Sequence, residues 1–306
     1  MRCRYITADV FTSHPLEGNP LAVFPDARGM TDDLMQRIAR ELNLSETTFV
    51  FPPDEPGNTR CLRIFTPKTE LDFAGHPTVG TAYVLAALGE IPLTGDETRI
   101  VFEENIGPVP VLIRSEGGKP FFTQLSVAKL PEQGPEPPDA ADLAEMLSLA
   151  PGDILASGED FPQAFSCGNA FLYIPLRNRD AVRRARLRID LWEDLLSEGW
   201  ASKIYLIARD PELPGSHLRA RMFSPAIGIG EDPATGAAVS ALGGYMGTRV
   251  ADRDGTFRWV VEQGFEMKRP SLLHLEVDKK DGEIVAVRVG GSSVLVSEGT
   301  MEIPDS

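Results

Sequence analysis

Alternating apolar and polar positions, typical of β-strands, dominate the first part of the chain. These strand-like segments are residues 5–11, 21–24, 47–51, 60–65, 99–102, 109–113 and 120–125. Two other segments carry helical patterns. Apolar residues recur every four positions over residues 31–42, which predicts an amphipathic helix that Thr31 caps. Residues 78–88 are apolar and contain no charged residue, which predicts a short helix buried on all sides.

A segment rich in proline and acidic residues, 131–139, interrupts this series. Such a composition resists packing into a core, and the alternation of strands and helices starts again after it. Because domains typically hold about 150 residues, a chain of 306 residues is expected to form two. We place an N-terminal domain at residues 1–126, completed by a last strand over 292–306, and a C-terminal domain at 127–291.

The second half of the chain repeats short motifs of the first half in the same order. Residues 18–25 (GNPLAVFP) match 168–175 (GNAFLYIP), 63–67 (RIFTP) match 221–225 (RMFSP), and 76–82 (HPTVGTA) match 232–238 (DPATGAA). The offset between matched segments stays between 150 and 158 residues. This repetition predicts two homologous halves related by an approximate two-fold axis.

The third repeat predicts a polar residue at the entrance of each of two small-residue helices. His76 and Asp232 each precede a proline, which is tolerated in a first helical turn because its missing N–H would be unpaired there. Gly80 and Gly236 have no side chain, so other groups can approach the first helical turns closely. Two such helix ends facing one cleft would attract an anion such as a substrate carboxylate. The alternative is that Asp232 only caps its helix.

Charge and composition exclude several functional classes. The chain has 45 acidic and 30 basic residues, a net charge of −15, which disfavours nucleic-acid binding. No apolar run reaches the roughly 20 residues that span a bilayer, and the N-terminus lacks the apolar stretch of a signal peptide, so we expect a cytoplasmic protein that does not bind membranes. Cys3, Cys61 and Cys167 form no CxxC pair and have no histidine at ligand spacing, so we expect buried thiols and no metal site.

Several motifs in combination resemble the phenazine-biosynthesis isomerase family (PhzF-like). They are DVF at 9–11, GNP at 18–20, LSET at 44–47, FAGHPT at 73–78, EDPATG at 231–236 and the closing VRVGGS at 287–292. The family is similar in fold to diaminopimelate epimerase. The resemblance therefore implies an α+β protein of two pseudo-symmetric domains, each a β-barrel-like sheet around a central helix, with the active site between them. The central helices would be 78–88 and 234–245. It also implies a homodimer that needs no cofactor.

The resemblance further implies an isomerase that moves a proton on a small amino or hydroxy acid, as the member for which the family is named does on trans-2,3-dihydro-3-hydroxyanthranilate. Glu46 matches the family's general acid/base glutamate. Partial burial at that position would favour a carboxyl that both takes and returns a proton near neutral pH. His76 and Asp232 match polar substrate contacts and complete the implied catalytic set. Gly75 and Gly236 match backbone positions near the substrate carboxylate.

Two positions leave the ligand open. Ala237 stands where the family usually carries a serine, whose hydroxyl would donate a hydrogen bond to the substrate, so the phenazine-type substrate is in question. Asn19 could hold a substrate amide or carboxylate, although its match at Asn169 fits a turn-stabilising role equally well. Two alternatives remain: a catalytically silent small-molecule-binding protein, and an epimerase or racemase with two bases. Two-thiol chemistry is disfavoured because neither Cys61 nor Cys167 lies at a helix entrance.

Overall fold

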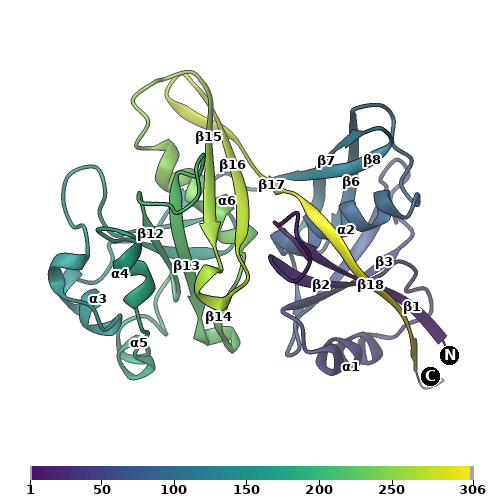
Figure 1. The fold of residues 1–306 in the computed structure, drawn as a ribbon, viewed down its shortest axis with the longest axis horizontal. Coiled ribbons are helices and arrows are strands. Elements are labelled where there is room, and N and C mark those ends of the chain that lie inside the picture. Colours follow the sequence, from purple (N-terminus) through teal and green to yellow (C-terminus); the bar gives the residue numbers. More distant parts are fainter. Residues whose placement is uncertain (1, 304–306) are drawn as a thin grey trace. The chain divides into compact units, whose positions relative to one another are not determined.

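The computed structural model describes residues 2–303, and the chain divides into two compact units, each shown in Figure 1. The N-terminal unit comprises Met1–Ala128 and Val289–Ser306, and the C-terminal unit comprises Lys129–Arg288. Both are mixed α+β structures in which strands outnumber helices. No helix within residues 2–303 combines the length and the apolar character that crossing a membrane requires.

The N-terminal unit is a curved sheet wrapped around one helix. Its strands are β1 (Arg2–Val10), β2 (Asn19–Phe24), β3 (Glu46–Phe51), β4 (Arg60–Phe65), β5 (Glu70–Leu71), β6 (Glu97–Glu104), β7 (Gly107–Glu116), β8 (Lys119–Ser126) and β18 (Ser293–Glu302), and its helices are α1 (Asp32–Leu42) and α2 (Gly75–Ala87). The strand β17 (Glu283–Gly291) returns from the C-terminal unit and pairs with β8. Because β18 follows it and pairs with β1, the strands surround α2.

The helix α2 fills the interior of this unit, as its lack of charge predicts. Eleven of its thirteen residues are buried, and it contacts β1, β2, β3, β7 and β8. Gly80 permits this close packing, because a Cβ there would lie 2.5 Å from Val10 Cγ2 and 2.6 Å from Leu21 Cδ2. The helix begins at Gly75, three residues before the predicted start. The predicted cap of α1 is confirmed, since the Thr31 side chain accepts a hydrogen bond from the N–H of Leu34.

The C-terminal unit repeats this plan. Its strands are β9 (Glu132–Gln133), β10 (Gln163–Ser166), β11 (Ala170–Pro175), β12 (Lys203–Ala208), β13 (Leu218–Ser224), β14 (Ile229–Asp232), β15 (Gly255–Gln263) and β16 (Ser271–Lys280), and its helices are α3 (Ala140–Met146), α4 (Arg179–Arg184), α5 (Ile189–Leu195), α6 (Gly236–Gly247) and the short 3-10 helices η1 (Pro151–Asp153), η2 (Pro225–Ile227) and η3 (Phe265–Met267). The parallel pairs β11–β12 and β13–β15 correspond to β2–β3 and β4–β6. The same succession of pairings thus accompanies the sequence repeat.

The predicted symmetry of the two helix entrances is wrong in detail. In α2, Pro77 lies in the first turn, as expected. In the C-terminal unit, however, Asp232 is the last residue of β14, and α6 begins only at Gly236 with Thr235 as its N-cap. The residue before proline therefore differs between the two units, since His76 is helical in α2 whereas Asp232 ends a strand.

Candidate functional site

The Glu46 carboxyl lies at the start of a buried strand. Glu46 opens β3, pairs with Leu21 of the parallel strand β2, and is only 8% exposed. Its Oε2 lies 3.3 Å from Nε2 of His76. The contact lacks hydrogen-bond alignment in this structure.

His76, which the sequence predicts at the entrance of a helix, is buried. It is the second residue of α2 and is 4% exposed. Asn19 Nδ2 lies 3.3 Å from its Nδ1, so the ring sits between Asn19 and Glu46. Gly18 places Asn19 at the start of β2 through a positive φ of 65°, where a Cβ would lie 2.3 Å from Val10 O. Three predicted site residues, from β2, β3 and α2, therefore come together.

Burial keeps the His76 ring neutral. Removal from water lowers the pKa of His76 to about 3, well below its ordinary value. When the Asn19 amide donates to Nδ1, the single ring hydrogen resides on Nε2, the nitrogen nearest Glu46. Asn19 thereby orients a neutral hydrogen-bond donor toward the carboxyl. Next to His76, Gly75 is the first helical residue, whose N–H has no acceptor within the helix.

The predicted residues of the C-terminal unit lie around the start of α6. The Thr235 hydroxyl donates to Asp232 Oδ2 at 2.5 Å, and Gln263 Nε2 donates to the Asp232 carbonyl at 2.8 Å. Gln263 Oε1 in turn accepts from the Tyr205 hydroxyl and from the Thr235 N–H. Gly236 follows as the first residue of the helix. Neither Thr235 nor Tyr205 was among the residues predicted to form the site.

Next to Gly236, Ala237 is the second residue of α6, and its methyl group carries no hydrogen-bonding atom. Asp232, Gly236 and Ala237 belong to the C-terminal unit, whereas Glu46 and His76 belong to the N-terminal unit.

Replacing Gly264 by alanine should destabilise the C-terminal unit and displace Pro233, which follows Asp232. Gly264 has a φ of 80°, and a Cβ there would lie 2.3 Å from Arg269 O and 2.5 Å from Pro233 O. Since these atoms belong to the backbone, we expect a loss of roughly 3 kcal/mol in the free energy of unfolding. Urea unfolding measures it. The matched control Gly215→Ala, at φ 87° with open space around it, should lose only about 1 kcal/mol; equal losses in the two variants would contradict the packing argument.

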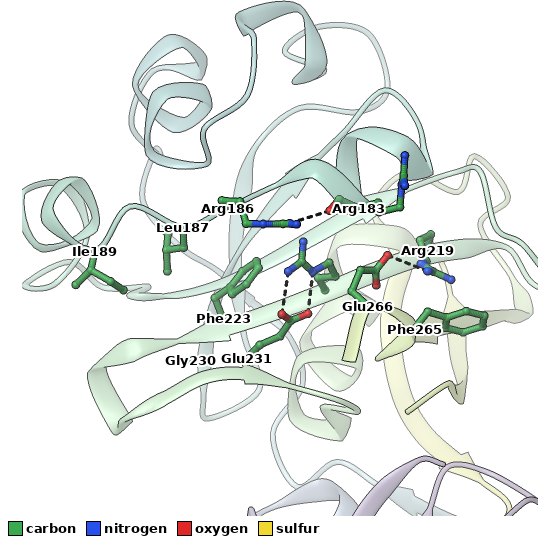
Figure 2. A pocket seen from close by; sticks show the side chains of 11 residues that line it. Arg183, Arg186, Leu187, Ile189, Arg219, Phe223, Gly230, Glu231, Phe265 and Glu266 are labelled. Atoms are coloured by element: carbon green, nitrogen blue, oxygen red, sulfur yellow. Dashed lines mark hydrogen bonds and ion pairs between the residues drawn. The ribbon is translucent and has the colours of Figure 1, made fainter. Parts of the chain in front are cut away.

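The C-terminal unit also contains a cavity of about 720 Å³, shown in Figure 2. Four arginines line it, and each donates hydrogen bonds to a carboxylate or to a backbone carbonyl. Arg221 forms a bidentate pair with Glu231, Arg219 pairs with Glu266, and Arg186 donates to backbone carbonyls. None of the predicted site residues lines this cavity.

The RIFTP and RMFSP repeat corresponds to an arginine–glutamate ion pair that has a structural role in each unit. Arg63 holds Glu70 through Nε and Nη2, as Arg221 holds Glu231. Each guanidinium also lies over the phenylalanine two residues later, at 5.3 Å for Arg63 and 4.8 Å for Arg221. The arginines fasten their strands to neighbouring segments in both units.

The chain is similar to known proteins over almost its whole length. A family model described as a phenazine biosynthesis-like protein matches residues 8–299. The chain is 41% identical to an uncharacterized isomerase of Mesorhizobium japonicum, over 98% of each chain. It is 34% identical to the trans-2,3-dihydro-3-hydroxyanthranilate isomerase of Pseudomonas aeruginosa, over 97% of this chain and 98% of that relative.

Solved structures show the same fold. A Bacillus anthracis phenazine biosynthesis protein of the PhzF family superposes with a TM-score of 0.89 at 29% identity, covering 99% of this chain and 100% of the other. A hydroxyproline epimerase from Agrobacterium vitis gives a TM-score of 0.63 at 13% identity, covering 99% and 93%. The predicted α+β fold of the diaminopimelate-epimerase-like type is thus confirmed.

Proposed function

Since this chain belongs to the family of phenazine biosynthesis-like proteins, and is an isomerase of the PhzF type, we propose that Glu46 transfers a proton between two carbons of a small carboxylic acid. In such an isomerisation one C–H bond breaks and its electron pair enters a double bond that shifts along the substrate, and a new C–H bond forms at the carbon that receives the proton. One carboxyl can act first as base and then as acid. We propose that the reaction needs no cofactor.

The contact between Glu46 and His76 carries this proposal. A buried carboxyl beside a neutral imidazole is a typical arrangement for a general base whose partner stays uncharged. Oε2 of Glu46 lies 3.3 Å from Nε2 of His76, and Asn19 holds the opposite ring nitrogen. His76 can therefore donate a hydrogen bond to the carboxylate or to a substrate oxygen without competing for the proton.

We propose that the substrate's carboxylate binds backbone N–H groups at helix starts. Gly75 begins α2 and Gly236 begins α6, and the first N–H groups of a helix lack partners within it. Asp232 would orient a polar group of the substrate. Each helix start contributes roughly 0.3–1 kcal/mol of attraction to an anion at the surface and up to about 2 kcal/mol when partly buried.

The test is conversion of a substrate panel by the purified chain, followed by proton NMR. The panel contains trans-2,3-dihydro-3-hydroxyanthranilate and small cyclic and acyclic amino and hydroxy acids. Conversion by the wild type and not by Glu46→Gln supports the proposal. Saturable binding of panel members without any conversion would contradict it and would favour a ligand-binding protein.

Replacing Ala237 by serine should raise kcat/KM for trans-2,3-dihydro-3-hydroxyanthranilate by about tenfold, because one added hydrogen bond to the substrate contributes up to roughly 1.5 kcal/mol. Steady-state kinetics of both proteins measure the change. Ala238→Ser, at the next and fully buried position of α6, is the control and should bring no gain. An unchanged or lower kcat/KM in Ala237→Ser would show that this substrate does not contact residue 237.

We also propose, from the family resemblance, that the chain is a cytoplasmic homodimer. Light scattering coupled to gel filtration should give twice the chain mass of 33.4 kDa. A mass equal to one chain across the concentrations used in the activity assay would overturn this assignment.

A further inference from the structure

The Glu104 carboxyl is buried without a cation. Glu104 is the last residue of β6 and is 7% exposed. Its Oε1 lies 2.6 Å from the hydroxyl oxygen of Thr78, and its Oε2 has no hydrogen-bond partner among the described residues. No lysine, arginine or histidine of residues 2–303 lies within ion-pair distance of this carboxyl. A buried carboxylate in this setting would be costly, so the acid form is favoured.

The Thr78 hydroxyl contacts two acceptors but carries one hydrogen. Its oxygen lies 2.8 Å from the Ala74 carbonyl and 2.6 Å from Glu104 Oε1. If the hydroxyl donates to Ala74, Glu104 must supply the hydrogen for the second contact, and a carboxylic acid does so. Burial raises the pKa of Glu104 to about 8, against a smaller lowering by Thr78, which agrees with the acid form at neutral pH.

This chain of hydrogen bonds ends on the peptide that precedes α2. Ala74 is the N-cap of the helix and provides no side-chain cap. Its carbonyl and the N–H of Gly75 belong to one planar peptide unit, so an interaction that fixes the carbonyl also fixes the direction of the N–H. We propose that Glu104 and Thr78 are positioning residues that aim the Gly75 N–H at the substrate's carboxylate. This inference rests on the proposed role of Gly75 in binding.

Among the described residues, no neighbouring cation neutralises the Glu104 carboxylate when Glu104 loses its proton. The ionisable groups on the elements around it are His76 and Tyr83 of α2, Arg60, Cys61 and Arg63 of β4, and Glu97, Arg99 and Glu103 of β6 itself. Arg60 donates to the backbone carbonyls of Thr59 and Glu90. Arg63 is bound to Glu70, and Glu103 accepts backbone N–H groups of Asp54 and Glu55. The pKa of the Cys61 thiol is raised, chiefly by burial and in part by Glu104, so it stays neutral.

Across the hydrogen-bonding ladder, β7 presents Gly107 opposite Glu104. A carboxylate at Glu104 would draw the Thr78 hydrogen to itself, and the Ala74 carbonyl would keep only the longer contact from the Thr78 N–H, at 3.3 Å. We expect KM to rise above pH 8 while kcat changes little, because the chain orients a binding group and not the base.

The test compares Thr78→Val, which removes the hydroxyl at nearly constant shape, with Thr78→Ser, which keeps it. On a substrate found by the panel, Thr78→Val should raise KM about tenfold with kcat within about twofold, and Thr78→Ser should match the wild type. Glu104→Gln keeps a donor for Thr78 but cannot titrate, so its KM should stay flat where that of the wild type rises. Loss of kcat alone in Thr78→Val, or the same alkaline rise in Glu104→Gln, would overturn the inference.

A second readout does not depend on turnover. In NMR spectra of the folded protein, the Gly75 amide signal should shift with a midpoint near pH 8 in the wild type and stay constant in Glu104→Gln. A Gly75 signal that does not respond to pH in the wild type would overturn the inference even if the enzyme is active. Conversely, full activity of Glu46→Gln would overturn the proposed base and leave this titration intact, so the two failures are distinguishable.

Discussion

Replacing Glu46 by glutamine should lower kcat by about 10²–10⁴-fold and leave the fold intact. Glutamine has nearly the same shape but can neither take nor return a proton at neutral pH. Glu46 is largely buried at the start of β3, and its amide variant keeps an oxygen for the contact with His76. Substrate binding should change little, because the proposed binding groups are backbone N–H groups elsewhere. Steady-state kinetics and thermal unfolding of both proteins measure the two effects.

The matched control is Glu41→Gln, an exposed glutamate near the end of α1 that changes the same charge. Its activity should equal that of the wild type. Glu46→Asp, which shortens the side chain by one methylene, should retain a measurable fraction of the activity. If Glu46→Gln keeps activity within threefold of the wild type, another residue is the base.

Replacing His76 by glutamine should lower kcat by about 100-fold, because the neutral donor beside Glu46 is lost and the Asn19 amide loses its ring nitrogen. Since the pKa of His76 is lowered to about 3, the ring does not titrate between pH 5 and 8. The pH profile of kcat in the wild type should therefore show no inflection from this residue. An acid limb that is present in the wild type and absent from His76→Gln would contradict the assignment of a neutral ring.

The same residue has a predictable effect on stability. In the unfolded chain His76 has a pKa of about 6.5. Below that pH the unfolded chain therefore binds a proton at His76, whereas the folded chain does not bind it until the pH approaches 3. The free energy of unfolding should fall as the pH drops from about 6.5 toward 3, with a slope of up to about 1.4 kcal/mol per pH unit from this group. His76→Gln should lack this component, which urea unfolding at several pH values measures.

Local patterns predicted much of the fold, but they failed where two chain segments interact. The uncharged run over 78–88 correctly predicted a buried helix. Its start at Gly75 was missed because a Gly-His-Pro sequence resembles a loop. The match between residues 76–82 and 232–238 predicted Asp232 at a helix entrance. In the structure Asp232 ends a strand, and three residues separate it from α6.

The site was predicted unevenly for the same reason. The motifs pointed to Asn19, Glu46 and His76, and the structure brings these three together from β2, β3 and α2. The burial of His76 could not be predicted, because it depends on the strands that surround α2. Thr78 and Glu104 stand 26 residues apart in the sequence, and only the closed sheet brings their oxygens to 2.6 Å.

The central claim, that Glu46 moves the proton, is tested most directly by isotope exchange. The wild type and Glu46→Gln are incubated in D₂O with trans-2,3-dihydro-3-hydroxyanthranilate and with the substrate that the panel identifies, and the carbon-bound hydrogens are followed by NMR. We expect deuterium at the carbon that receives the proton in the wild-type reaction and none with Glu46→Gln. Equal deuterium incorporation by both proteins would contradict it.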